Sequence, residues 1–550
     1  MQPSTEEHLK EDLLDVLTSK EPLGPRATEQ MLSHRDAFRE LYATKADLAA
    51  RLQPGRPAYV VGRKGAGKTA FLIGEGMASG SDVVSVKAEN AFQVMDALRR
   101  RWEQRRGPLP VDNLVFLWEA VLVHAAMRGV LSLARKADAN RLNLVNRYLE
   151  SLVPTPTATP GTGVRVPEQS EDQFLAALGQ RLVEAIDADT GIAAVRDVVA
   201  GIGSADLTYA TARQVLVEML ERPERGARLC VVVDNLEDLH MQIDGLEEAL
   251  AGLFRIVSRV TDPSDPIRLP FELRFAFPAE LVPKLRSITA NPEKDFRNPL
   301  TIEWTAHELI DLAGRRLRTS LAVHFADPRH RLDARFRPEL SPEDVLRAVL
   351  PQERFHNGLG GVEDPVGYLM RHTQLLPRHL IQILNEVTSP MFSESRLRPV
   401  TPAELRHGVR VAERTIVEGI LSSYHYEFRQ LGECLERLRN HLPFAFDEEQ
   451  LRDAYTKAGA KRASGQRFEE FLWSAVNAGV IGVQVDHTER YVVGEFSYTY
   501  EGGLRPEKDD RLCLHPLFVR VLNDERRLRR LSSSGTRPVY PYGRGMEALL

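Results

Sequence analysis

The chain has 550 residues, of which 43% are hydrophobic and 27% are charged. This composition excludes collagen-like, mucin-like and wholly disordered proteins, and the length predicts three or four domains. Its 72 basic and 77 acidic residues give a net charge of −5, so no global basic field gathers nucleic acid or an anionic membrane. Any contact with nucleic acid must therefore be local.

Compartment and membrane contact are predicted from three further features. Cys230, Cys434 and Cys513 lie far apart and form no CxxC pair, which argues against a disulfide framework and a cysteine zinc site. The first twenty residues contain no apolar segment of the kind found in secretory signals. The apolar stretch from Leu114 to Leu133 contains charged residues and has helical spacing, which indicates a core helix. We expect a cytoplasmic protein with no membrane contact.

The first half of the chain predicts an α/β domain with a large helical insertion. Residues up to about 50 have helical spacing and lead into a domain that starts near Arg56. An apolar strand at Ala58–Val61, a Gly-rich turn, a helix and a second strand near Val83–Val86 form a βαβ opening. Residues 91 to 228 are almost entirely helical in pattern, and the Pro/Thr/Gly stretch Pro154–Gly163 predicts an exposed loop within them.

Strands, then helices, are predicted next. Strand patterns return at Leu229–Val233 and Leu273–Phe277. From Thr301 to about Thr388 the pattern is helical, and Thr305 with Glu308 forms a capping-box signature at the start of a helix.

The last part of the chain predicts a mixed module. Helical patterns from Thr401 onward are followed by an alternation of Phe496, Tyr498 and Tyr500 that predicts one face of a strand. A closing apolar segment at Leu512–Leu522 follows. Helices followed by a short β-ribbon are typical of a winged-helix-like domain.

The strongest motif is the Gly-rich turn after the first strand. Residues 62 to 69 read G-R-K-G-A-G-K-T, the P-loop pattern G-x-x-x-x-G-K-[ST], between a strand and a helix as a P-loop requires. The glycines let backbone N–H groups converge on phosphate oxygens, and the helix N-terminus adds partial positive charge. We expect Lys68 to contact the β- and γ-phosphates and Thr69 to ligate Mg²⁺. The predicted nucleotide-binding residues are Gly62, Arg63, Lys64, Gly65, Ala66, Gly67, Lys68, Thr69 and Ala70.

A second motif predicts the metal ligand. Leu229–Val233 is too continuously apolar for a half-exposed strand and ends in Asp234, as a buried parallel strand that delivers an acid to Mg²⁺ would. Asn235 follows instead of the Glu that many ATPases use to polarise water, so Glu237 or Asp238 is the candidate general base. The alternative is that both acids only stabilise a helix N-terminus. No base-reading Asn-Lys-x-Asp pattern of GTP-binding proteins follows the P-loop, so we expect ATP with Mg²⁺.

These motifs resemble those of bacterial P-loop ATPases of the Sll1717 type, distant relatives of AAA+ and STAND/NACHT ATPases. The resemblance rests on Gly62–Ala70 and Val231–Asp238, with further similarity at Trp118, Leu376–Ile381 and His515–Phe518. It implies an ASCE-type core, a helical lid and a winged-helix-like C-terminal region over roughly residues 56 to 522.

The resemblance also implies sensor residues. In such relatives a lid arginine often senses the γ-phosphate, and Arg378 stands at the expected position, with a structural salt bridge as the alternative. The strand Leu273–Phe277 departs from the pattern, because it runs into Pro278 without a polar residue at its tip. Candidates for a trans-acting arginine finger are Arg255, Arg259, Arg315 and Arg316, with a solvated helix charge as the alternative for each.

We therefore predict an α/β fold with a P-loop NTPase core on a parallel sheet. Residues 1–50 are expected to be an N-terminal helical segment, and 51–300 the core with its insertion at about 91–228. Residues 301–395 are expected to be a helical lid subdomain, and 396–525 a winged-helix-like domain. Residues 526–550 are expected to be a disordered tail, with the arginine cluster Arg526–Arg530 as a solvated helix end.

Three functions fit these predictions. In the first, ATP binding switches association with a partner, an effector or further copies of the chain, and the resemblance suggests antiphage defence. In the second, the ATPase acts on DNA through the winged-helix region, although Glu469 and Glu470 on the candidate recognition helix would repel phosphate, while Lys461 and Arg462 lie nearby. A small-molecule kinase is the third, and no acceptor pocket is readable for it.

Overall fold

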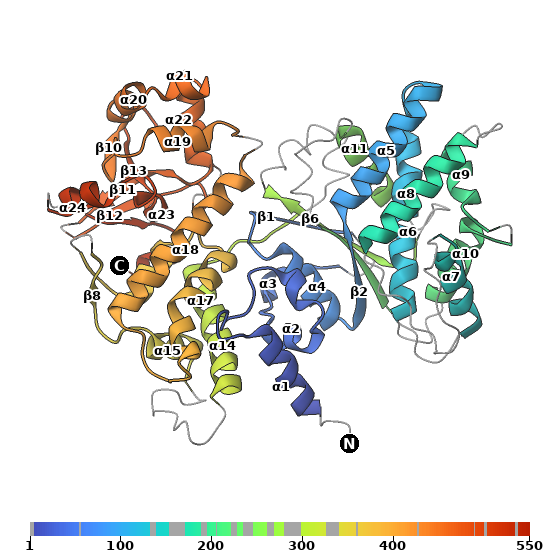
Figure 1. Cartoon of the computed structure of the whole chain (residues 1–550), viewed down its shortest axis with the longest axis horizontal. Coiled ribbons are helices and arrows are strands. Elements are labelled where there is room, and N and C mark those ends of the chain that lie inside the picture. Colours follow the sequence, from blue (N-terminus) through green and yellow to red (C-terminus); the bar gives the residue numbers. More distant parts are fainter. Residues whose placement is uncertain are drawn as a thin grey trace. The chain divides into compact units, whose positions relative to one another are not determined.

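The computed structural model describes residues 5–53, 57–132, 139–152, 171–188, 195–204, 206–221, 228–234, 246–260, 269–279, 299–325, 340–358, 361–425, 428–488, 490–499, 503–533 and 537–549. The chain forms two compact units (Figure 1). The α/β unit comprises Thr44–Ile302, and the C-terminal unit comprises Glu303–Leu550 together with the N-terminal segment Met1–Ala43.

The α/β unit is built on a five-stranded parallel sheet with the order β2-β5-β6-β1-β7. Its strands are β1 (Ala58–Gly62), β2 (Ser81–Lys87), β5 (Arg228–Asp234), β6 (Glu272–Pro278) and β7 (Leu300–Thr301). Strand β5 is buried from its second residue to its last, as expected of a central parallel strand covered on both faces. The four strands predicted from apolar runs are therefore confirmed.

Helices cover both faces of this sheet. A Cβ on Gly76 of α4 (Lys68–Ala78) would meet Val83, whereas a Cβ on Gly129 of α6 (Val111–Ser132) would meet Val84. Because successive strand residues point to opposite faces, α4 and α6 lie on opposite sides of β2. On the α6 side, Phe254 of α11 (Leu246–Val260) packs against aromatic rings from β1 and β6. The result is a three-layer α/β/α arrangement.

The predicted helical insertion is confirmed between β2 and β5, and Figure 1 shows its helices gathered together. Its helices are α5 (Ala88–Arg106), α6, α7 (Ala139–Leu152), α8 (Glu171–Asp187), α9 (Val195–Gly201) and α10 (Tyr209–Leu220), with a two-stranded hairpin of β3 (Gly203–Ser204) and β4 (Leu207–Thr208) before α10. The fully buried Trp118 anchors α6 by donating to the backbone oxygen of Ala249 on α11, 2.8 Å away. The predicted loop Pro154–Gly163 lies outside the described residues.

Helix α6 is also the one described helix that is long and apolar enough to cross a membrane. Its apolar window lies within Val111–Leu131 and is 83% buried inside the protein. The prediction that this stretch is a core helix is thus confirmed.

The N-terminal segment packs within the C-terminal unit. It contains α1 (Thr5–Val16), η1 (Thr28–Met31) and α2 (Arg35–Leu41), whereas α3 (Ala46–Ala49) falls in the α/β unit. The side chain of Asn385 binds the backbone N of Leu23 and the backbone oxygen of Gly24, at 2.8 and 3.0 Å. Arg316 also donates to the oxygen of Leu23, at 3.0 Å. These contacts hold the segment against α14 (Ala306–His324), which contains Arg316, and α17 (Pro377–Ser393), which contains Asn385.

Helices dominate the first part of the C-terminal unit. They are α14 (Ala306–His324), α15 (Pro342–Val349), α16 (Pro365–Arg371), α17 (Pro377–Ser393) and α18 (Pro402–Ser423), with the short strands β8 (Phe355–His356) and β9 (Val362–Glu363) before α16. The predicted capping box is confirmed, because Thr305 accepts from the backbone N of Glu308 while the Glu308 carboxylate accepts from that of Thr305.

The second part has the topology of a winged helix. Its helices are α19 (Leu431–Arg437), α20 (Glu448–Lys457), α21 (Ala460–Ser464) and α22 (Phe468–Asn477). Its sheet has the order β10-β13-β11-β12-β14, with β10 (Ala445–Asp447), β11 (Ile481–His487), β12 (Val492–Glu495), β13 (Arg511–Leu514) and β14 (Val539–Pro541). Strand β10 follows the first helix, and β11 follows the last. The winged-helix-like prediction is confirmed at the level of the fold.

Two sequence predictions in this part are wrong. Phe496 and Tyr498 do not share a strand face: they follow β12, partly in a turn, where both rings pack against His515. Their apolar character reflects burial around that imidazole, and Tyr500 lies outside the described residues. The expected disordered tail instead contains α24 (Glu525–Ser533), β14 and η6 (Met546–Leu549), because β14 pairs in parallel with β12 and buries Tyr540. The short helix α23 (Pro516–Val519) precedes them.

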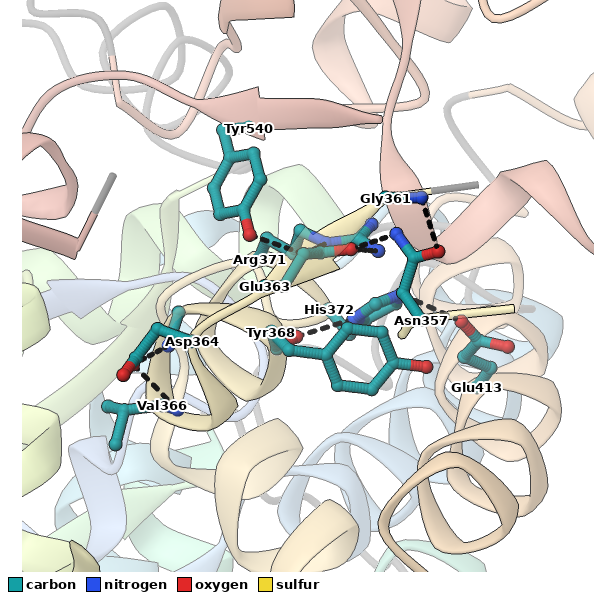
Figure 2. A network of polar contacts seen from close by, with 11 residues as sticks. Asn357, Gly361, Glu363, Asp364, Val366, Tyr368, Arg371, His372, Glu413 and Tyr540 are labelled. Carbon is teal, nitrogen blue, oxygen red and sulfur yellow. Dashed lines mark hydrogen bonds and ion pairs between the residues drawn. The ribbon is translucent and has the colours of Figure 1, made fainter. Parts of the chain in front are cut away.

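A buried polar network ties β14 to the helices of the same unit, as Figure 2 shows. Arg371 makes a two-pronged ion pair with Glu363, with N–O distances of 2.7 and 2.9 Å. Tyr540 and Asn357 also donate to the Glu363 carboxylate. Burial raises the pKa of Glu363, but Arg371 and these hydrogen bonds outweigh it, so the pKa lies below its ordinary value.

Candidate functional site

The Gly-rich turn forms the loop that the sequence predicts, between β1 and α4. Gly65 and Gly67 have φ angles of +88° and +90°, a conformation that favours glycine. Gly67 is the N-cap of α4, so the first N–H groups of this helix face the loop. Gly62 is tightly enclosed, since a Cβ there would lie 3.3 Å from both the oxygen of Ile302 and the Cβ of Ala66. The loop thus has the backbone geometry of a phosphate cradle.

Lys68 starts α4 and turns its amino group back to the loop. Its Nζ donates to the backbone oxygens of Gly62, at 3.0 Å, and Arg63, at 3.3 Å. The side chain is only 5% exposed. An ammonium held at the rim of a loop of N–H donors suits a polyphosphate, because all these groups prefer anionic oxygen.

Thr69 and Asp234 meet although 165 residues separate them. The Thr69 hydroxyl donates to Oδ2 of Asp234, which is 5% exposed at the carboxyl end of β5. A hydroxyl and a carboxylate side by side next to a phosphate loop are the oxygen donors that Mg²⁺ prefers. Among the residues that the structure describes, no group of three or more His, Cys, Asp or Glu could hold a metal ion. Mg²⁺ would therefore need oxygens from the nucleotide or water as well.

Strand register adds one residue that the sequence did not single out. Lys87, the last residue of β2, lies directly opposite Asp234 in the parallel pairing of β2 with β5. It is the exposed last residue of a strand, which is an ordinary place for a charge, so only the register reveals that it neighbours the candidate metal ligand.

The tip of β6 is apolar, as the sequence indicates. Phe277 and Pro278 pair with Val61 and Gly62 of the P-loop strand. A polar sensor side chain from this strand end is therefore missing among the described residues. The buried Arg274 lower in β6 binds the oxygen of Leu72 at 3.0 Å and thus anchors α4 to the sheet.

The other predicted site residues lie elsewhere. Glu237 and Asp238 lie outside the described residues. Arg378 is the half-buried second residue of α17 in the C-terminal unit. The structure brings Thr69 of the loop Gly62–Ala70 together with Asp234, and the roles of all the predicted site residues remain predictions.

Three of the arginine-finger candidates have partners within their own unit. Arg255 pairs with Asp112 at 2.9 Å, and Arg315 pairs with Asp311 at 2.7 Å. Arg316 is buried, its pKa is lowered to about 10 by that burial, and it holds the N-terminal segment. Arg259 has a helix-end position on α11, near Glu119. Arg316 is thereby accounted for as a structural residue.

Fold and loop together define a P-loop NTPase core. One strand, β6, separates the P-loop strand β1 from the acid-bearing strand β5, which is the ASCE-type order that the resemblance implies. Helical and winged-helix-like parts follow the core in the chain.

The comparisons with known proteins identify no family. No protein-family model matches the chain, and no curated protein matches it. Similar solved structures include the ORC2 protein of Aeropyrum pernix in ADPNP and ADP complexes, at 12% identity over 92% of this chain and 93% of that chain, with a TM-score of 0.37. Another is the ORC1 protein of Aeropyrum pernix in complex with DNA, at 14% identity over 96% of each chain, with a TM-score of 0.33. A third is Cdc6p of Pyrobaculum aerophilum, at 12% identity over 92% of this chain and 95% of that chain, with a TM-score of 0.26. With TM-scores this low, the function proposed below rests on this chain's own residues.

Proposed function

We propose that the protein binds and hydrolyses MgATP and uses the nucleotide as a switch. The observation that supports this most directly is the meeting of Thr69 with Asp234 beside the cradled amino group of Lys68. The contiguous loop, with Lys68 and Thr69, thus meets an acid that lies 165 residues further along the chain.

Each residue has a proposed role. The backbone of residues 62 to 70 holds the phosphates, Lys68 pairs with the β- and γ-phosphates, and Thr69 with Asp234 ligates Mg²⁺. Glu237, with Asp238 as the alternative, activates the attacking water. Arg378, by the resemblance, is the proposed sensor of the γ-phosphate.

In this proposal, ATP binding changes which proteins the chain associates with. ATP would alter contact with a partner or effector protein, or with further copies of the chain, in the cytoplasm. The resemblance would assign this switch to antiphage defence. Plaque counts on cells that carry the wild type or Lys68→Ala would test that assignment, and equal counts would remove it.

Steady-state phosphate release tests whether the protein hydrolyses ATP. Wild type and Arg51→Ala, an exposed cation of the same unit, should hydrolyse ATP, while Lys68→Ala and Glu237→Gln should lose on the order of a hundredfold or more. Light-scattering mass with and without ATP measures assembly. Unchanged hydrolysis in Lys68→Ala would contradict the site.

The second candidate is a DNA-associated ATPase. The observation that favours it is the winged-helix order of α19, α20 and α22 with β10, β13 and β11. Duplex DNA should then raise the hydrolysis rate, whereas the switch alone predicts ATP-dependent assembly without DNA stimulation.

A further inference from the structure

Helix α24 is held in a fixed orientation at its first turn. Asp524 accepts from the backbone N of Arg527 at 2.8 Å and from Nδ2 of Asn440 at 3.1 Å. Asn440 in return accepts from the backbone N of Asp524 at 2.8 Å. Leu528, 6% exposed, faces inward. One face of the helix is therefore fixed inward and the opposite face outward.

The outward face is cationic. Arg526, Arg529 and Arg530 are exposed, and the helix as a whole contains four arginines and one glutamate. That glutamate, Glu525, lies 3.9 Å from Arg410 of α18, whose side chain is 53% exposed. Arg410 thus extends the positive surface onto a second helix. Partial burial, and after it repulsion from Arg530, lowers the pKa of the neighbouring Arg527, while Asp524 acts in the opposite direction.

Helix α22, which occupies the recognition-helix position of the winged helix, differs from α24 in its charges. On α22, Glu469 pairs with Arg452 at 2.9 Å, and Glu470 pairs with Arg467 at 2.7 Å. Near them, Lys457 of α20 pairs with an aspartate one turn earlier, at 3.5 Å. Three cations around α22 thus pair with acids of the same module, while the four arginines of α24 stand beside the two acids Glu525 and Asp524.

The side chains on the outward face of α24 favour one kind of anionic partner over another. An anionic membrane favours helices that also insert apolar side chains, yet none of the described apolar side chains of α24 is exposed. Arginines three and four residues apart lie about 5–6 Å from one another along a helix, and each offers a planar fork for phosphate oxygens. A regular row of phosphates is the partner that this geometry fits best.

We propose that α24, with Arg410, binds the sugar-phosphate backbone of duplex DNA without reading its sequence. The binding surface consists of Arg410, Arg526, Arg529 and Arg530. This proposal takes its partner class from the DNA-associated alternative above, but it does not depend on the ATP site. Lys68→Ala should therefore bind DNA as the wild type does, and a failed ATPase assay would leave the proposal standing.

Fluorescence anisotropy with a labelled 30-base-pair duplex, over a range of NaCl concentrations, tests the surface. The variant replaces the three exposed α24 arginines by Gln, and a charge-matched control replaces Lys457, Lys461 and Arg462 by Gln near α22. Three lost phosphate contacts should lower the slope of log affinity against log salt by about three and weaken binding on the order of a hundredfold at 0.1 M salt. The control variant at Lys457, Lys461 and Arg462 should change the salt slope and the affinity by much less.

Several outcomes would overturn the proposal. These are an unchanged affinity in the α24 triple, a loss confined to the α22 control, and no wild-type binding at 50 mM NaCl. Poly-glutamate and phosphatidylserine vesicles serve as competing probes. If either binds as tightly as DNA and with the same dependence on the α24 arginines, the surface recognises an acidic protein or a membrane instead.

Discussion

The burial of Glu413, on α18, leads to a specific prediction about how the stability of the protein depends on pH. The Glu413 carboxylate, in a side chain that is 3% exposed, lies 3.2 Å from Nε2 of His372. The Nδ1 of His372 lies 2.6 Å from the backbone oxygen of Tyr368 and must carry a proton to bind it. Burial lowers the pKa of His372 well below its ordinary value, so Nε2 has no proton of its own. Neither oxygen of the Glu413 carboxyl has a hydrogen-bond partner among the described residues, so this carboxyl is more stable with its proton than as a buried charge.

Burial also raises the pKa of Glu413, to about 7, against the opposing pull of Arg520, Arg371 and Arg410. The folded protein thus holds this proton more tightly than the unfolded chain, in which the pKa is about 4.5. This contribution to stability is complete below pH 4.5, falls as the pH rises towards 7, and is lost above. The rise in pKa corresponds to about 3 kcal/mol.

Glu413→Gln removes that titration while it keeps the shape of the side chain. The variant should become more stable than the wild type as the pH rises from 4.5 to 7, with a difference that grows by up to about 3 kcal/mol and then stays level. Urea unfolding at pH values from 4.5 to 8.5, followed by circular dichroism, measures it. If the curves of stability against pH run parallel in the two proteins, the assignment of a raised pKa to Glu413 is wrong.

Three further substitutions test the packing of the C-terminal unit. Tyr540→Phe removes a buried hydrogen bond to the Glu363 carboxylate and should lower the free energy of unfolding by about 1.5–3 kcal/mol in the same urea assay, so a neutral result would contradict the role given to this network. Gly314→Ala should cost at least about 2 kcal/mol, because its Cβ would lie 1.9 Å from the oxygen of Pro342. Gly419→Ala, with nothing within 4 Å, should instead stabilise by about 0.5–1 kcal/mol, and equal effects of the two glycine substitutions would refute the steric argument.

Features that depend on local chemistry could be predicted from the sequence. The P-loop turn needs glycine at Gly65 and Gly67, and the capping box at Thr305 and Glu308 closes over four residues. The end of β5 at Asp234 follows from a continuous apolar run. In each case the residues that decide the structure are neighbours in the chain.

Features that depend on residues far apart in the chain could not be predicted from the sequence. Tyr540 is ordered by Glu363, 177 residues away, so a tail rich in Pro, Gly and Ser looked disordered. Phe496 and Tyr498 gave a strand-like alternation because both rings surround His515. Sequence spacing likewise could not show that β2 would place Lys87 beside Asp234.

Calorimetric titration of ATP, with and without Mg²⁺, tests the central claim most directly. The wild type should bind MgATP, and Arg51→Ala should bind it equally well. Lys68→Ala should lose most of the affinity, because it removes the ammonium that faces the phosphate loop. Asp234→Asn should lose the Mg²⁺ dependence, because it weakens the carboxylate that meets Thr69. Equal MgATP affinity in all four proteins would contradict the assignment of the nucleotide site.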